Sequence, residues 1–215
     1  MGYGIKILVK GAYACFTRPE MKVERVSYDV MTPSAARGII EAIYWKPAIV
    51  WRIDKIHVLH KIEFTNIRRN ELKNKIALSE GKIKKTVEGE ADTFYQVITD
   101  DRQQRAALIL KNVAYVIEAH FEMTDKAGEA DTPEKHYNIA KRRMEKGQCY
   151  NQPYLGTREF SASFEWVEDT PKSFYEGKKI DLQYMLYDID FQKNREPIFF
   201  RAEMLDGIID LGVVM

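Results

Sequence analysis

The 215-residue sequence predicts an α+β protein. Two segments carry the signature of a capped helix, because each begins with a Thr-Pro pair, at Thr32-Pro33 and at Thr132-Pro133. The segments between and after them are rich in β-branched and aromatic residues that alternate with polar ones, which is typical of strands. In chain order the elements run strand–helix–strand–strand and then strand–helix–strand, the order of a ferredoxin-like or RRM-type fold. We therefore expect a ferredoxin-like domain over residues 1–158 and a small antiparallel β-sheet region over residues 159–215.

The first strand and the first helix follow from residue spacing. Residues 3–13 alternate apolar and polar side chains, which predicts a strand. The first Thr-Pro pair starts a helix, and Pro47 bounds that helix at its other end. Tyr44 falls at the border between the two faces of this helix, where its ring can pack while its hydroxyl points outward. The side chains expected to be buried are those of Ala36, Ile39, Ile40 and Ile43.

The middle of the chain predicts three strands and one insertion. Residues 48–60 have the composition of a strand, and residues 61–69 are expected to pair with it. Residues 70–90 are lysine-rich and short of apolar side chains, which predicts a mobile insertion. Residues 105–122 alternate along most of their length and predict a further strand.

The second helix and the C-terminal strands complete the expected fold. The helix should end near Lys146, where Gly147 supplies a terminator. Residues 154–166 alternate as a strand does, and Asp206-Gly207 predicts a hairpin turn. The residues of the helix expected to face the core are Tyr137, Ala140 and Met144, and the last strands are expected at 182–191, 198–204 and 208–214.

Charge is unevenly distributed along the chain, although the net charge is only +1. Residues 159–215 hold 6 Lys/Arg against 12 Asp/Glu, a balance of −6, so residues 1–158 carry +7. Such a field can orient a polyanion, but solubility charge without any partner explains it equally well. No run of eighteen apolar residues and no secretion-signal layout occurs, so we expect a cytoplasmic protein without a membrane partner.

Metal, nucleotide and acyl-transfer chemistry find no support in the motifs. The histidines have no carboxylate cluster at ligand spacing, so no metal or other cofactor is expected. The glycine-rich phosphate loops and the GxSxG elbow are missing from the sequence. Three histidines are expected to be structural or solvent-facing: His57, His60 and His120.

The Lys135-His136 pair is a candidate for acid–base chemistry. Both residues fall in the first turn of the second helix, where the macrodipole disfavours positive side chains. This placement should bias His136 toward the neutral form that a general base needs, and it makes the helix start attractive to a phosphate. The alternative is a His-Lys pair on a solvated helix face. Tyr44 taken alone is likewise more often a half-buried aromatic than a catalyst.

Basic residues and one loop indicate nucleic-acid binding. The rear half of the second helix is basic and could follow a phosphate backbone. Residues 146–158 are polar and aromatic with two glycines, a composition that suits phosphate contact and base stacking, although ordinary connections look similar. The residues expected to contact RNA are Arg37, Lys141, Arg142, Arg143, Lys146 and Arg158.

Several long motifs resemble one family. The sequence resembles the CRISPR-associated Cas-five proteins of the type I-C (Dvulg) subtype, which are members of the RAMP superfamily, and the resemblance covers nearly the whole chain. The motifs that carry it are Gly11–Thr17, Tyr28–Pro47, Gln104–Leu110, Lys135-His136-Tyr137 and Tyr154–Phe160.

The resemblance implies an endoribonuclease that processes precursor CRISPR RNA. The family's catalytic tyrosine, lysine and histidine correspond to Tyr44, Lys135 and His136 in this sequence. It also implies a ferredoxin-like RAMP domain, and a subunit that stays on the 5′ handle and joins the other subunits of the type I-C complex. Our hypothesis is metal-free cleavage near the base of the repeat hairpin, by 2′-hydroxyl attack that leaves a 2′,3′-cyclic phosphate. The alternatives are a non-catalytic subunit that binds the CRISPR RNA handle, and duplex-DNA binding through the lysine-rich residues 70–90.

Overall fold

The structure, a computed structural model, describes residues 3–21, 23–74, 76, 78–89, 95, 97–191 and 193–212. The chain divides into two compact units. The first unit comprises Met1–Thr65 together with Leu108–Met215, and the second comprises Asn66–Ala107. The strands β3 (Phe64–Leu72) and β4 (Arg102–Met123) each contain residues of both units.

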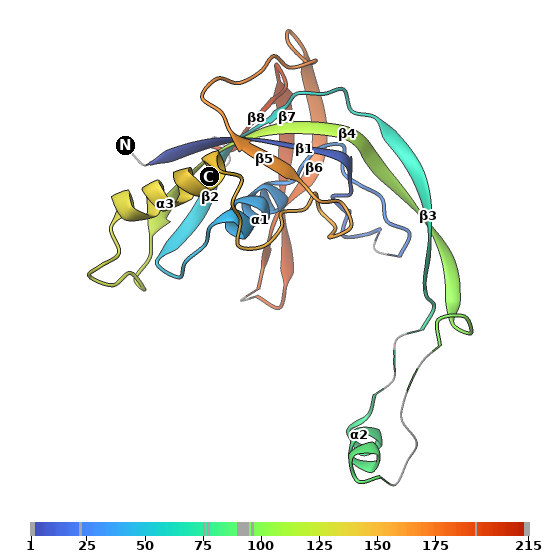
Figure 1. The fold of residues 1–215 in the computed structure, drawn as a ribbon. Helices are drawn as coiled ribbons and strands as arrows, with labels where there is room; N and C mark the ends of the chain where they lie inside the picture. The colour runs from blue at the N-terminus through green and yellow to red at the C-terminus, as the bar shows by residue number, and fades with distance from the viewer. Residues whose placement is uncertain are drawn as a thin grey trace. The chain divides into compact units, whose positions relative to one another are not determined.

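The first unit is built on an antiparallel sheet, with the strand order β5-β1-β4-β2-β8-β7-β6 (Figure 1). Each strand pair along this path is antiparallel, and the predicted α+β class is confirmed. The helix α1 connects β1 to β2, and α3 connects β4 to β5. The strands are β1 Gly4–Ala14, β2 Ile49–Val58, β4 Arg102–Met123, β5 Ser163–Trp166, β6 Lys179–Asp190, β7 Glu196–Leu205 and β8 Ile208–Asp210.

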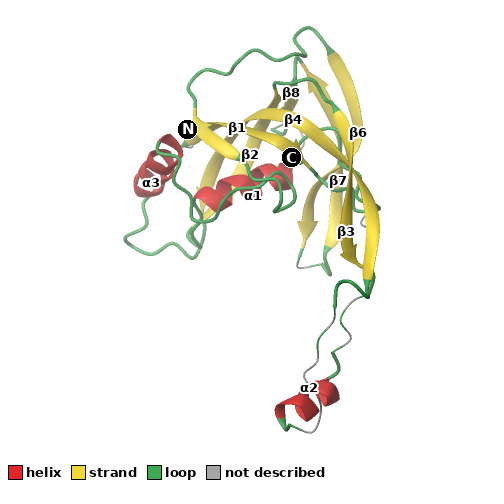
Figure 2. Cartoon of the chain, turned by 45° about the vertical axis from the view of Figure 1, so that its right-hand side comes forward, coloured by secondary structure: helices red, strands yellow, loops and turns green. Residues whose placement is uncertain are grey.

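The two long helices begin at the predicted Thr-Pro pairs (Figure 2). In α1 (Pro33–Ile43) the Thr32 hydroxyl accepts a hydrogen bond from Ala35 N–H, and in α3 (Pro133–Glu145) the Thr132 hydroxyl accepts one from Lys135 N–H. Both N-caps satisfy a backbone donor that the first helical turn leaves unpaired. Neither described long helix, nor the short α2, is long and apolar enough to cross a bilayer.

The main core lies between the two helices and one face of the sheet. All four apolar residues predicted for the buried stripe of α1 are buried there. In α3 the fully buried residues are His136, Ala140 and Met144. Tyr137 also packs against the core, so all three residues of the predicted stripe face it, and the prediction left out only His136. Tyr137 is half-buried and packs its ring 5.1 Å from that of Tyr3. A smaller cluster on the opposite face of the sheet comprises Leu8, Leu59, Ala114 and Val116.

Two strand predictions need correction. The third strand, β3 (Phe64–Leu72), pairs with β4 and not with β2. Both edges of β2 are occupied, because β4 lies on one side and β8 on the other. Residues 154–166 form a strand only from Ser163 onward. Before it, Gly156 has a φ of +85° and Leu155 N–H bonds back to Phe160 O, so this part of the chain is a tight loop.

The second unit contains the lysine-rich segment predicted near residues 70–90. Within it β3 pairs with β4, and Lys73 N–H donates to Asp101 O at 2.8 Å. The segment is not wholly irregular, because it includes the helix α2 (Glu80–Val87), whose N-cap is Ser79. Residues 75, 77 and 90 of the predicted insertion lie outside the described residues.

The C-terminal strands complete the sheet of the first unit. Asp206 and Gly207 both have positive φ, 54° and 79°, and they join β7 to β8 as the predicted hairpin turn. Residues 213 and 214 of the last expected strand lie outside the described residues. The expected domain boundary at residue 158 falls before β5, which pairs with β1, and that boundary stays a prediction.

Candidate functional site

A tyrosine and a histidine meet where α1 ends and α3 begins. Tyr44 is the C-cap of α1, and its hydroxyl oxygen lies 2.7 Å from Nδ1 of His136 in the first turn of α3. The two side chains come from positions 92 residues apart, and their residues are only 2% and 1% exposed. The structure therefore brings together two of the three residues that the sequence predicts as catalytic.

The other nitrogen of His136 faces a carboxylate. Nε2 lies 3.3 Å from Oδ1 of Asp131, although it has no hydrogen bond of normal geometry among the described residues. A neighbouring negative charge favours a proton on Nε2. We assign the tautomer accordingly, so that the Tyr44 hydroxyl donates to Nδ1.

Lys135 belongs to the same cluster through Asp131. Its Nζ lies 2.9 Å from Ala130 O and 3.4 Å from Asp131 Oδ1. Asp131 also accepts a hydrogen bond from Gly128 N–H at 3.1 Å, so its carboxylate is held in place. Sequence reasoning missed Asp131, for which the available signal was its position directly before the Thr-Pro helix start.

The electrostatics keep the tyrosine protonated and the histidine neutral. Burial lowers the pKa of His136, the nearby Asp131 carboxylate raises it, and the Lys135 ammonium lowers it further. The net direction is downward, as the sequence predicts, and burial is the largest of these causes. Burial raises the pKa of Tyr44, against a smaller lowering effect of the Arg143 guanidinium.

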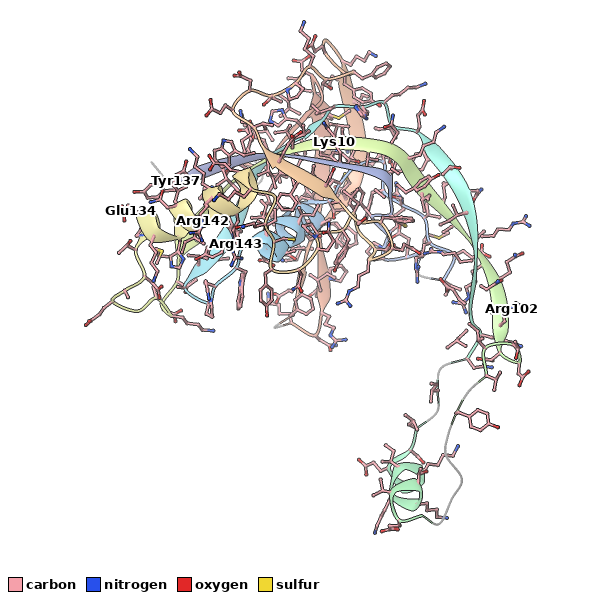
Figure 3. All side chains as sticks on the ribbon, viewed as in Figure 1. Lys10, Arg102, Glu134, Tyr137, Arg142 and Arg143 are labelled. Atoms are coloured by element: carbon pink, nitrogen blue, oxygen red, sulfur yellow. The ribbon has the colours of Figure 1, made fainter. Side chains whose placement is uncertain are left out.

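An open groove of about 960 Å³ passes Tyr44. Arg143 forms part of its wall: Nη1 donates to Ile43 O at 2.8 Å, and the guanidinium lies 5.3 Å from the centroid of the Tyr44 ring. The labelled side chains of Arg142 and Arg143 come from the same helix, α3 (Figure 3). The groove is lined by Gly38, Glu41, Ala42, Tyr44, Trp45, Lys46, Pro47, Arg143, Tyr150, Asn151, Gln152, Pro153, Tyr154 and Arg158.

The groove lining combines positive charge with exposed rings. Much of it comes from residues 146–158, the loop whose composition indicates nucleic-acid binding. Two of its aromatic residues are strongly exposed, Tyr150 at 80% and Trp45 at 52%. Exposed rings beside cations can stack bases while the cations contact phosphates. Of these aromatics, only those inside the loop were indicated by the sequence; Trp45 was not.

The six predicted RNA-contacting residues fall into different environments. Arg143 and Arg158 line the groove, while Arg142 and Lys146 are exposed on α3 and at its C-cap. Lys141 lies 5.1 Å from the centroid of the Trp166 ring and 3.8 Å from Glu145.

Arg37 lies in a different setting from the other five. Its guanidinium makes a paired hydrogen bond to Asp188 on β6, and it lies 3.5 Å from Glu41. Its charge is therefore balanced within the protein, and the structure does not bring it into the groove lining.

The remaining histidines have protein partners. His57 Nε2 lies 2.9 Å from Glu118, and burial lowers the pKa of His57 despite that carboxylate. His120 Nδ1 lies 2.8 Å from Asp54, and His60 Nδ1 lies 2.9 Å from Asn112 O. Their contacts agree with the structural or surface roles that the sequence predicts.

Fold and site together define a class: an α+β protein with a buried Tyr–His pair next to a basic, aromatic groove suited to a single-stranded polyanion. A family model described as CRISPR-associated protein (Cas_Cas5), Cas_Cas5d, matches residues 4–212. The chain therefore belongs to the Cas5d family of CRISPR-associated proteins, and the resemblance to the type I-C subtype is confirmed.

Two relatives match nearly the whole chain. A protein of Mannheimia succiniciproducens named CRISPR pre-crRNA endoribonuclease Cas5d is 54% identical over 98% of this chain and 96% of its own length. A protein of the same name from Thermus thermophilus is 37% identical, over 96% of this chain and 90% of its own. A crystal structure described as a CRISPR-associated protein superposes with a TM-score of 0.70 at 25% identity, covering 97% of this chain and 91% of that one.

Proposed function

We propose that this protein is a metal-independent endoribonuclease that cleaves the repeat of precursor CRISPR RNA. It then remains on the 5′ handle as a subunit of the type I-C surveillance complex. Family membership and the name of the relatives support the substrate class. The observation that carries the proposal is the 2.7 Å contact between Tyr44 and His136 at the wall of a basic groove.

The proposed fold is a ferredoxin-like RAMP domain followed by a small antiparallel sheet. The strand order β5-β1-β4-β2, with α1 and α3 as the two connecting helices, supports this assignment. Because β5 would supply the fourth strand, we place the end of the domain after β5 and not at residue 158. The strands β6, β7 and β8 would then form the C-terminal part.

In the proposed reaction the ribose contacts Tyr44, and His136 accepts the proton that Tyr44 gives up. The 2′-hydroxyl gives its proton to the Tyr44 oxygen while Tyr44 passes its own proton to Nδ1 of His136. The 2′-oxygen forms a bond to phosphorus, and the bond from phosphorus to the 5′-oxygen breaks. The leaving 5′-oxygen takes a proton from water, so the products are a 2′,3′-cyclic phosphate and a 5′-hydroxyl. Proton transfer of this kind contributes about 10²–10⁴-fold to a rate.

Three neighbouring groups would support that proton route. The Asp131 carboxylate, 3.3 Å from Nε2, stabilises the imidazolium that forms when Nδ1 takes the proton. Lys135, held beside Asp131, corresponds to the family's third catalytic residue and would stabilise charge on the phosphate. Arg143 lines the groove next to the Tyr44 ring and is placed to bind the same phosphate.

The near-complete burial of both rings favours a second candidate, a non-catalytic subunit that binds the handle. In that case the hydrogen bond between Tyr44 and His136 only joins α1 to α3, and the groove holds RNA without cutting it. A third candidate, duplex-DNA binding, is supported by the exposed lysines of α2. Its affinity would fall steeply with salt, whereas a flat salt response would exclude it.

A cleavage assay separates these candidates. Purified protein is incubated with labelled repeat RNA in the presence of EDTA, and we expect a single cut that Tyr44→Phe removes while RNA binding is kept. The matched control is Tyr175→Phe, which loses a buried hydroxyl outside the groove and should still cut. Binding without cutting by the wild-type protein would favour the handle-binding subunit, and inhibition by EDTA would contradict the metal-free route.

A further inference from the structure

A glycine in the middle of α1 has no structural reason within the chain. Gly38 is exposed, its φ is not in the left-handed region, and a Cβ added there would meet nothing within 4 Å. Glycine is a much poorer helix former than alanine, so this position weakens the helix without relieving any close contact. The space over Gly38 is therefore open to a ligand.

Two hollows meet at this glycine. Gly38 lines the groove beside Tyr44, and it also lines a second pocket of about 290 Å³. Tyr154 is the other residue shared by both linings. The two hollows therefore adjoin at Gly38 and Tyr154. The second pocket is lined by Phe16, Thr17, Thr32, Ser34, Ala35, Gly38, Tyr154, Gly156 and Leu186.

The chemistry of the two hollows differs. The groove is lined by the cations Arg143, Arg158 and Lys46 and by one carboxylate, Glu41. Among the residues that the structure describes, none that lines the second pocket is charged. Its polar groups are hydroxyls such as those of Thr17 and Ser34. Its rings are those of Phe16, which is buried, and Tyr154, which is 39% exposed. Hydroxyls and a ring suit a nucleobase, while a phosphate would remain with the arginines of the groove.

The wall opposite α1 is firmly placed. A Cβ at Gly156, which has a φ of +85°, would lie 2.0 Å from Cys15 O, so the loop packs directly on the backbone that follows β1. Cys15 N–H also donates to Leu155 O at 3.0 Å. This contact holds the loop, and with it the neighbouring Tyr154, at a set distance from the helix.

We propose that the second pocket binds the base of one RNA nucleotide next to the cleavage site, stacked on Tyr154, and that the RNA backbone crosses α1 at Gly38. The pocket volume lies near the lower end of the ~300–1,000 Å³ range of ligand sites, which suits one base and not an oligonucleotide. This inference rests on the proposed function, since it places a further nucleotide of the same RNA.

The first test substitutes the glycine. Gly38→Ala should raise Tm by roughly 1–4 °C, because alanine favours the helix. The added methyl group should nevertheless weaken binding of the repeat RNA about 10-fold, since it fills the crossing point. Gly81→Ala in α2, where a Cβ also meets nothing within 4 Å, is the matched control and should leave binding unchanged. Unchanged RNA binding by Gly38→Ala would overturn the proposal.

The second test locates the base. Tyr154→Ala should weaken RNA binding by roughly 5- to 150-fold, as expected for the loss of one stacked base. With an RNA that carries an abasic nucleotide at the matching position beside the cut, Tyr154→Ala should cause no further loss. Equal losses on intact RNA and on every abasic RNA in a scan across the cleavage site would contradict the base pocket.

Both tests use repeat RNA with a 2′-deoxy nucleotide at the cleavage site, so binding is measured without cutting. If wild-type protein binds but never cleaves ribose-containing repeat, the catalytic proposal fails and the pocket still stands on the binding results. If cleavage occurs but neither variant affects binding, only the pocket proposal fails. Absence of any repeat binding would reject both.

Discussion

Replacing Tyr44 by phenylalanine removes a single oxygen atom from the centre of the candidate site. The ring keeps its packing at the end of α1, but the oxygen that lies 2.7 Å from His136 Nδ1 is lost. Because both residues are almost fully buried, the ring nitrogen of His136 is left without a partner. The expected cost is about 1–3 kcal/mol of the free energy of unfolding, measured by urea denaturation.

Tyr44→Phe should slow cleavage by more than its loss of stability alone would cause. Under the proposed reaction, Tyr44→Phe removes the group that carries the proton to His136, so single-turnover cleavage of repeat RNA should slow by about 10²–10⁴-fold. His136→Asn should have a similar effect. Because the two residues act as one unit, the double variant should cleave no more slowly than the slower single variant.

The control variant isolates chemistry from folding. Tyr175 is also buried, and its hydroxyl accepts a hydrogen bond from Ile62 N–H at 2.8 Å, outside the groove. Tyr175→Phe should lose a comparable amount of stability and cleave at the wild-type rate. Wild-type cleavage by Tyr44→Phe, or losses that multiply in the double variant, would refute the proton route.

Three further predictions concern charge. The rate of cleavage should fall only below about pH 6.5, because the pKa of His136 lies below its usual value. Asp131→Asn removes a charge that raises this pKa, so the fall in rate should move to lower pH. Lys135→Met removes a charge that lowers the pKa, so the fall should move to higher pH. The imidazole of His136 binds a proton more tightly in the unfolded chain than in the folded one, because folding lowers its pKa. The stability that neutral His136 contributes above about pH 6.5 should therefore be lost as the pH falls. The difference in Tm between wild type and His136→Asn should shrink in acid. Arg143→Gln should lower the salt slope of RNA binding by about one phosphate contact, whereas Arg201→Gln, on the exposed surface of β7, should leave the slope unchanged.

Local signals in the sequence predict the helices well. The Thr-Pro pairs locate both helix starts, because capping and proline geometry depend on neighbouring residues alone. The face of α3 is less well predicted. The predicted residues Tyr137, Ala140 and Met144 do face the core, but the prediction leaves out His136, which is buried more deeply than Tyr137. A tertiary contact explains the burial of His136, because its side chain lies within hydrogen-bond distance of Tyr44 from α1.

Strand pairing is the part of the fold that residue patterns could not predict. Alternation identifies β3 as a strand, but its partner depends on which sheet edge is free, and β8, from the C-terminal end of the chain, occupies the edge of β2. Likewise the alternation in residues 154–166 looks continuous, while the contact of Gly156 with the Cys15 backbone turns the first half into a loop.

The sequence predicts which residues of the candidate site are catalytic, but it does not predict the contacts that those residues and their neighbours make. The family resemblance singles out Tyr44 and His136, and the structure brings them into contact. Asp131 directly precedes the Thr-Pro helix start, but this position alone does not show that its carboxylate lies 3.3 Å from the imidazole of His136. The pairing of Arg37 with Asp188 spans 151 residues, so no local spacing could show that its charge is already balanced.

The most direct test of the proposed reaction removes one atom from the RNA, the 2′-oxygen at the cleavage site. Repeat RNA is prepared with either ribose or 2′-deoxyribose at the nucleotide before the cut, and both are incubated with wild-type protein under single-turnover conditions with EDTA. We expect the ribose substrate to give one upstream fragment ending in a 2′,3′-cyclic phosphate. The deoxy substrate should bind equally well and stay intact. Cleavage of the deoxy substrate would contradict attack by the 2′-hydroxyl at the Tyr44–His136 site.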